Sequence, residues 1–516
     1  MSTNLIDAGI DERTLTFLAL GGSGIRTLEP LLYLCAFGLG PRQLRLVLVD
    51  PDQSNAAVKR ALQLIDLYRE TRRALAEQGA ANGYFRTEVV DAVGDALVWS
   101  PIADDEGLAN PRFATRVDRT LMRGRSAALG HLFDLLNAER IREMDLTMGF
   151  RGIPSIGTVF MNRLREQGFF AQLVAQGQAE AGSVYFAAGS IFGGTGSAAF
   201  PVVGRALADG IRGDGRSPDI AGIPPGRVGG ALYLPYFTLP SPPTREAADG
   251  GPRPETVLFA QNAAGALPTY LTTATGYGAL YVLGDAVPRE QACNEVGGEK
   301  QDNGAHYVEL YGALAALDFA ARGGEDPQAR LPLFRGTAVE ARDPGWGDLP
   351  LDAPSRERLM GALVAAHTFL RAFRPDGGAN GDLTDTLRGV TWLSLLKLRP
   401  EELLARSAAL DGMGRFFRRA WNWLAELRGG NPALALARAS GRPRQVRPDE
   451  LIEGRHAAGE GRRARHDEYR VFRHWNEAAH RHAATGFPGF MEVMREGSEG
   501  YARAAFAENA RPGGAA

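Results

Sequence analysis

A glycine-rich turn between an apolar run and a helical segment limits most strongly what this chain can fold into. Residues 183–188 form a short apolar run, as expected of a buried strand, and residues 198–208 are typical of a helix. Backbone N–H groups at a loop between two such elements point toward an anion, and the helix dipole favours negative charge there. The sequence therefore predicts a phosphate-binding loop, whose hydroxyl groups add further donors. Its residues are Gly193, Gly194, Thr195, Gly196 and Ser197.

The N-terminal region repeats this arrangement. An apolar strand is predicted over 15–20 and a helix over 25–37, and a second apolar strand over 44–49 ends at Asp50. Strand, glycine turn, helix, strand and acid are the beginning of a βαβ nucleotide-binding unit. The spacing is not a full G-x-G-x-x-G, because Thr27 stands where the third glycine would be. The turn consists of Gly21, Gly22, Ser23 and Gly24.

The two glycine loops together predict the fold class. Loops on neighbouring strands of one parallel sheet can hold a di- or triphosphate from two sides. A tight turn between a strand and a helix is the alternative for either loop, but it does not account for both loops and for the acid after the second strand. We therefore predict an α/β fold whose Rossmann-like parallel sheet binds a nucleotide.

Composition excludes several other classes of protein. The chain has 516 residues, a net charge of −2 and two cysteines, Cys35 and Cys293. Two cysteines exclude a disulfide framework, and the eight histidines show no metal-ligand spacing. The low net charge gives no field that attracts nucleic acid or an acidic membrane. Without a signal-peptide pattern or a long apolar run, we expect a cytoplasmic protein with no membrane span and no nucleic-acid partner.

Both loops resemble those of the tubulin/FtsZ superfamily, and its bacterial tubulin-like members more than FtsZ itself. Gly193–Ser197 match the family signature GGTG[ST] after a strand, and Gly21–Gly24 match its first glycine loop. The resemblance implies a Rossmann-like GTPase domain with a parallel sheet over residues 1–320, followed by a central helix. It also implies GTP or GDP with Mg²⁺ as ligands, with the first loop at the α- and β-phosphates and the second at the β/γ end. Ala198 stands where the family has a last glycine.

A third match lies further along the chain, within an expected irregular insertion, central helix and loop over 321–385. Asn380–Asp385 resembles the N-x-D-x-x-D catalytic loop that follows the central helix in FtsZ, and a helix is predicted over 354–373 before it. The resemblance implies that Asp382 and Asp385 reach the nucleotide of the next subunit, where they orient the attacking water and help to hold the cation. Hydrolysis would then depend on head-to-tail assembly into a filament. The alternative is that these residues only shape a turn.

Four further polar residues and one arginine are candidates for contacts with the nucleotide. Asn303 and Asn262 are candidates for the base, with a helix N-cap and plain solvent exposure as their respective alternatives. Asp50 and Asp52 are candidates for the ribose or the cation, and an Asp-Pro turn is the alternative. Arg151 is a candidate for a phosphate, or else a surface residue in a turn.

The leading interpretation is a tubulin-like, cytoskeletal GTP-binding protein that hydrolyses GTP to GDP and phosphate between subunits. Residues 386–516 would form a divergent, mostly helical C-terminal region. A second hypothesis is a non-catalytic, nucleotide-dependent scaffold or switch with other protein partners in a bacterial system. A third is a dinucleotide-binding oxidoreductase, suggested by Gly21–Gly24 and Asp50; it leaves Gly193–Ser197 unexplained and lacks a paired catalytic acid and base.

Overall fold

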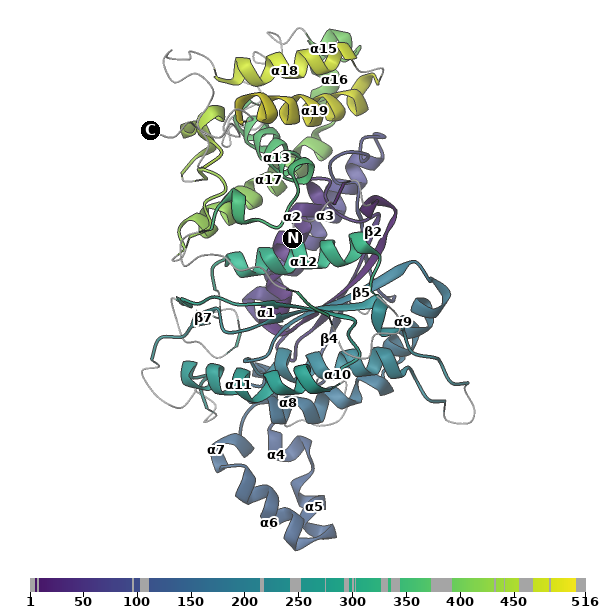
Figure 1. Ribbon diagram of the computed structural model, residues 1–516, viewed down its shortest axis with the longest axis vertical. Coiled ribbons are helices and arrows are strands. Elements are labelled where there is room, and N and C mark those ends of the chain that lie inside the picture. Colours follow the sequence, from purple (N-terminus) through teal and green to yellow (C-terminus); the bar gives the residue numbers. More distant parts are fainter. Residues whose placement is uncertain are drawn as a thin grey trace.

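Eight segments of the described chain pair side by side as parallel strands of one sheet (Figure 1). The computed structural model describes residues 5–6, 9–94, 97–102, 111–213, 218–241, 252–273, 275–291, 297–298, 301, 303–325, 333–335, 344–372, 392–430, 433–439, 441–453, 467–481 and 484–506. The strands are β1 (Thr14–Leu20), β2 (Gln43–Val49), β3 (Glu88–Asp91), β4 (Val98–Trp99), β5 (Ser183–Ser190), β6 (Val228–Tyr233), β8 (Ala279–Leu283) and β10 (Leu333–Arg335). The predicted α/β class with a parallel sheet is confirmed.

The order of the strands reverses at the centre of the sheet. Along the sheet the order is β10-β8-β6-β5-β1-β2-β3, and β4 also pairs with β2. The chain therefore moves outward from β1 in one direction, returns to β5 and moves outward in the other. Leu20 at the end of β1 is paired with Val49 of β2 and with Gly189 of β5. The loops after these three strands consequently leave the same edge at the same level, beside the point where ligands bind in open α/β sheets.

The central strands are buried because helices cover both faces of the sheet. Every residue of β1 and β5 is buried, as their uninterrupted apolar runs predict. One face carries α1 (Gly21–Arg26), α2 (Leu28–Ala36), α3 (Ala56–Ala76) and α12 (Tyr307–Arg322) (Figure 1). The other face carries α8 (Pro154–Met161), α9 (Gly168–Ala179), α10 (Thr195–Asp209) and α11 (Thr256–Thr272). A separate two-stranded sheet joins β7 (Phe237–Thr238) to β9 (Arg289–Glu290).

Helix α12 is the helix that lies along the sheet on the α1 side. It is buried from Val308 to Ala321, and it packs on β1, β5, β6, β8 and α2. A helix that is apolar on all sides is found inside a protein. The helix expected over 354–373 also forms, as α13 (Ala353–Ala372), but it packs on helices of the C-terminal region. Asp382 and Asp385 lie outside the described residues, so the structure does not place the expected catalytic loop.

The C-terminal region is helical where it is described, and it shares one hydrophobic core with the sheet. Helix α17 (Ser407–Arg428) packs on α3 and α13, and α19 (Gly486–Phe506) packs on α13 and α18 (Asp467–Arg481). Phe416 of α17 contacts Tyr33, Tyr68 and Phe85 at ring-centroid distances of 5.5, 5.8 and 4.9 Å. The helices of this region are α15 (Trp392–Leu395), α16 (Pro400–Leu404), α17 (Ser407–Arg428), α18 (Asp467–Arg481) and α19 (Gly486–Phe506).

A group of short helices projects from the opposite end of the molecule (Figure 1). It lies beyond the face that carries α8 and α10, far from the C-terminal helices. Its members are α4 (Phe113–Arg116), α5 (Arg119–Arg125), α6 (Ala127–Leu136) and α7 (Glu139–Arg142). None of the helices in the described ranges combines the length and the apolar character needed to cross a membrane.

Candidate functional site

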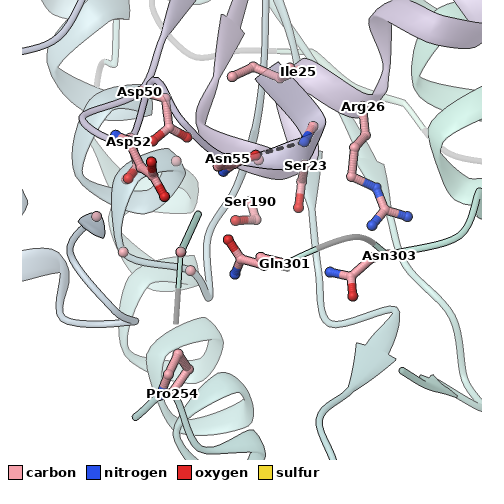
Figure 2. A pocket seen from close by; sticks show the side chains of 18 of the residues that line it. Ser23, Ile25, Arg26, Asp50, Asp52, Asn55, Ser190, Pro254, Gln301 and Asn303 are labelled. Carbon is pink, nitrogen blue, oxygen red and sulfur yellow. Dashed lines mark hydrogen bonds between the residues drawn. The ribbon is translucent and has the colours of Figure 1, made fainter. Parts of the chain in front are cut away.

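A pocket opens at the carboxyl edge of the sheet, where the strand order reverses (Figure 2). Its walls come from both glycine loops, from the turn after β2, and from segments 148–152 and 301–309. Figure 2 shows Asp50 and Asp52 on one side of the pocket and Arg26 and Asn303 on the other. The structure thus brings together elements that are spread over some three hundred residues of sequence. Among the predicted loop residues, those that line the pocket are Gly22, Ser23, Gly193, Gly194, Thr195 and Gly196.

The two predicted glycine loops touch each other. Gly21 has a φ of +67°, and a Cβ at this position would lie 2.8 Å from the backbone nitrogen of Gly196. Only glycine satisfies both the positive φ and this close approach. Helix α10 begins at Thr195 without a side-chain cap, and α1 likewise begins at Gly21 without one. The first N–H groups of a helix have no partner within the helix, so both N-termini offer donors to an anion in the pocket.

Helix α1 is short, but it continues into α2. Thr27 between them has helical angles, φ −64° and ψ −23°, and its N–H donates to the carbonyls of Ser23 and Gly24. The glycines of this loop have different tasks. A Cβ on Gly24 would lie 2.2 Å from the carbonyl oxygen of Ala188, so Gly24 allows α1 to pack on β5. A Cβ on Gly22 would meet no atom within 4 Å, because this part of the backbone faces open space in the pocket.

Ser197 is turned away from the role predicted for it as a donor to a ligand. Its hydroxyl donates to the carbonyl oxygens of Gly193 and Gly194, which directly precede the start of α10. Gly194 is in turn covered by a third loop, since a Cβ there would lie 2.7 Å from the carbonyl carbon of Phe150. The candidate loop residues therefore divide into those that face the pocket and those that hold the loop in shape.

The third loop, residues 149–152, carries Arg151 into the wall of the pocket. Arg151 is only 6% exposed, with a φ of +47°, so it is not the surface residue considered as an alternative. Its guanidinium donates to the carbonyl oxygen of Pro252 at 3.4 Å. Asn262 ties the same loop to the β5–α10 loop: its amide donates to the carbonyls of Gly152 and Phe192, at 2.9 and 3.1 Å. Asn262 therefore positions the loops around the pocket.

Asp50 and Asp52 form an acidic wall directly after β2. They are 4% and 3% exposed. The Asp50 carboxylate accepts the N–H of Asp52 at 2.9 Å. Asp52 accepts the N–H and the hydroxyl of Ser54, and also the N–H of Gly298 at 2.7 Å. Burial raises the pKa of Asp50 from 3.8 to about 7; the Asp52 N–H opposes this rise, and the neighbouring Asp52 carboxylate adds to it.

These buried carboxylates fit a hard cation, because Mg²⁺ prefers oxygen ligands and often takes only one or two from the protein. A cation beside Asp50 would also remove the cost of a buried negative charge. Across the described ranges, no cluster of three or more His, Cys, Asp or Glu side chains is placed to bind a metal on its own. A cation at Asp50 and Asp52 would therefore need further oxygens from a ligand such as a phosphate.

A buried ion pair closes the opposite side of the pocket. The guanidinium Nε of Arg26 lies 2.6 Å from Oε1 of Glu309, whose side chain is 2% exposed. Oε1 also accepts the Tyr236 hydroxyl at 3.0 Å, and Oε2 accepts the N–H of His306 at 3.1 Å. The sequence analysis missed this pair, because its members are 283 residues apart and only their separate contexts, the turn after β1 and the start of a helix, were visible.

Asn303, the candidate for contact with the base, lines the pocket next to this ion pair. Its alternative assignment as a helix N-cap is wrong, since His306 caps α12 in a reciprocal arrangement with Glu309. Gln301 lies beside Asn303 in the same wall (Figure 2). Amide side chains offer both donors and acceptors, which suits the edge of a nucleotide base. Searches with protein-family models and among curated proteins gave no match to this chain.

Proposed function

We propose that this chain binds GTP with Mg²⁺ in the pocket at the reversal of the strand order, in the manner of tubulin/FtsZ-like proteins. The observation that carries the proposal is the contact between Gly21 and Gly196, which joins two helix N-termini in one wall. A single glycine turn is common between a strand and a helix. Two such turns that touch, at the place where open α/β sheets bind ligands, favour a polyphosphate over a structural role.

Different walls of the pocket would contact different parts of the nucleotide. The loops at Gly22 and Gly193–Gly196 would hold the phosphates with backbone N–H groups, and Thr195 would add a hydroxyl. Asp50 and Asp52 would hold the cation. When bound, Mg²⁺ supplies positive charge that neutralises the phosphate oxygens. Asn303, with Gln301, would contact the base.

Hydrolysis and filament assembly belong to the same proposal. Asp382 and Asp385 of a neighbouring copy would orient the attacking water, so that turnover would need contact between subunits. The test is GTP turnover measured against protein concentration. A rate per subunit that rises with concentration and falls in Asp382→Ala supports shared active sites. A slow rate that does not depend on concentration refutes this part of the proposal while leaving binding intact.

Binding itself is tested by the nucleotide that the protein retains and by one glycine substitution. After denaturation of the purified protein, released GTP or GDP would support the proposal, whereas released NAD(P) would favour the oxidoreductase hypothesis. In Gly22→Ala the added Cβ enters the open pocket without touching the protein. We expect GTP affinity to fall roughly tenfold or more, equivalent to about 1.4 kcal/mol, measured by titration calorimetry on nucleotide-free protein.

The matched control is Gly124→Ala in helix α5, where a Cβ also meets nothing within 4 Å and which is not part of the pocket wall. Both variants replace a helical glycine, which stabilises by about 0.5–1 kcal/mol. We expect both proteins to fold at least as stably as the wild type. Unchanged GTP affinity in Gly22→Ala would contradict the predicted position of the phosphates.

One observation favours a second candidate, a nucleotide-dependent switch without rapid turnover. Arg60 lines the pocket and pairs with Glu29 at 3.0 Å and with Glu426 of α17 at 3.4 Å. Glu426 also accepts the N–H of Ala305, another residue of the pocket wall. Occupancy of the pocket could thus act on α17 directly. Slow turnover together with GTP-dependent hydrogen-exchange protection of α17 would favour the switch over the filament-forming GTPase.

A further inference from the structure

Helix α6 turns its apolar side outward, against the usual arrangement of a surface helix. Leu129, Leu132, Leu135 and Leu136 are 55%, 49%, 82% and 70% exposed. Their spacing places them on one face of the helix. Leu121 of the adjoining helix α5 is 49% exposed as well. We call Leu121 and these four side chains the leucine face.

The inward side of α6 is held by charge and by aromatic contact, so the helix cannot simply rotate to bury its leucines. Asp134 accepts a bidentate hydrogen bond from Arg119, at 2.6 and 2.7 Å, and a further one from Arg123 at 2.8 Å. The hydrogen bond from Arg119 is the main reason that the pKa of Asp134 is lowered to about 2. Phe133 packs on Phe113 at a centroid distance of 5.5 Å.

We propose that the leucine face is a self-association surface, on which α6 packs antiparallel to α6 of a second copy across a twofold axis near Leu132. Contiguous exposed apolar side chains on a soluble chain mark a binding surface. A twofold contact uses the same patch on both subunits, so it requires that the patch complement itself. The sequence of α6 and its flanks meets this requirement.

The self-complementarity follows from an antiparallel alignment centred on Leu132. Leu129 of one copy then lies opposite Leu135 of the other, and the small Ala128 lies opposite the large Leu136. Large and small side chains that alternate across a helix pair allow close packing. Arg125 ends α5 just before α6, Glu139 begins α7 just after it, and both residues are exposed. Since they flank opposite ends of α6, an antiparallel contact brings Arg125 of one copy to the end where Glu139 of the other lies.

A head-to-tail use of the leucine face is less well supported by the described surface. The other exposed large apolar side chains there are Val159, Val257, Val287 and Leu395. Each lies on a different segment, so no other helix in the described ranges carries a row of such side chains. Among the described residues, the surface of matching character is therefore the leucine face of another copy. The inference does not depend on what the pocket binds.

Sedimentation velocity of the 516-residue chain without nucleotide, from about 1 to about 100 µM, tests the proposal. We expect the wild type to shift with concentration from the 55.4 kDa monomer to a species of twice that mass. Leu135→Glu should weaken the dimer roughly tenfold or more, because both copies lose a central apolar contact. Leu395→Glu, at the 40% exposed Leu395 on α15, is the matched control and should leave the dimer intact.

A charge exchange tests the proposed antiparallel orientation. Arg125→Glu alone and Glu139→Arg alone should each weaken the dimer, by roughly threefold or more, since like charges would then face each other twice. The double variant, and an equimolar mixture of the two single variants, should restore dimerisation. Restoration would not follow from a merely structural role of either residue.

Several outcomes would overturn the proposal. A wild type that stays monomeric over the whole range excludes it. A dimer that tolerates Leu135→Glu places the contact elsewhere. Monomeric protein whose leucine face binds vesicles of anionic phospholipid would assign this surface to membranes instead. Head-to-tail assembly would be recognised separately, because it gives open-ended species that depend on nucleotide and persist in Leu135→Glu.

Discussion

The buried carboxylate of Glu309 allows a quantitative test of how the wall of the pocket is held. It accepts hydrogen bonds from Arg26, Tyr236 and the N–H of His306, at 2.6, 3.0 and 3.1 Å. In Glu309→Gln the side chain keeps its shape, but one oxygen becomes an NH₂ group. The amide has two possible orientations. In one, the NH₂ group faces the donors of Arg26 and Tyr236; in the other, it faces the N–H of His306. In both, two donors point at each other. The substitution also leaves the Arg26 cation without its buried partner.

The cost of this change can be bounded from the structure. Removal of one member of a fully buried ion pair costs about 3–5 kcal/mol. Arg26 borders the pocket and is 13% exposed, so water can replace part of what is lost. We therefore expect Glu309→Gln to lower the free energy of unfolding by about 2–3 kcal/mol. Urea unfolding at pH 7 measures it, provided that the m-value is unchanged.

Glu453→Gln is the matched control for this prediction. Glu453 pairs with Arg428 at 2.8 Å, with the two side chains 27% and 38% exposed, and such a pair contributes about 1 kcal/mol or less. The double variant Arg26→Gln with Glu309→Gln should be less destabilised than the sum of its single variants, because it leaves no unpaired cation. If Glu309→Gln costs no more than Glu453→Gln, the Arg26–Glu309 pair does not hold this wall.

Two further predictions concern the interior. Gly312→Ala on α12 should lower the free energy of unfolding by about 3 kcal/mol, because its Cβ would lie 1.8 Å from the hydroxyl of Tyr233. Urea unfolding measures this loss. If Gly312→Ala is as stable as Gly124→Ala, the contact between α12 and β6 is not tight. His367, with Nε2 3.0 Å from the carbonyl of Val446, has a pKa lowered from 6.5 to about 4, mainly by burial. As the pH falls, the unfolded state therefore binds a proton before the folded state does. The free energy of unfolding should decrease from pH 6.5 to pH 4 by at most about 3 kcal/mol. The decrease should be smaller in His367→Gln.

The sequence was sufficient to predict the parallel sheet and the positions of the two glycine loops. Buried parallel strands are continuous apolar runs, and glycine is required where Gly21 meets Gly196, so both features leave a local trace. The helix that lies along the sheet could not be chosen in this way. Residues 307–322 and 353–372 are both apolar enough to be buried, and only their partners distinguish α12 from α13. The resemblance to FtsZ led us to expect the central helix at residues 354–373, where α13 forms.

The polar walls of the pocket were predicted only in part. Asp50 and Asp52 follow a strand directly, and their position at the carboxyl edge follows from that. Arg26 and Glu309 meet only because α12 folds back over α1, and neither residue has a local pattern that indicates an ion pair. The leucine pattern of α6, taken from the sequence alone, is typical of a helix that buries its leucines. Their exposure depends on which side Arg119 and Arg123 occupy.

The packing of α17 on α2 and α3 has a consequence for how the chain folds during its synthesis. Arg60 and Glu426, which meet across this contact, are 366 residues apart. At a typical synthesis rate, α3 leaves the ribosome roughly 20 to 70 s before its partner exists. During that interval the face later covered by Phe416, with Tyr33, Tyr68 and Phe85, stays open to solvent. A nascent chain of this protein therefore exposes an aromatic surface until α17 has been made.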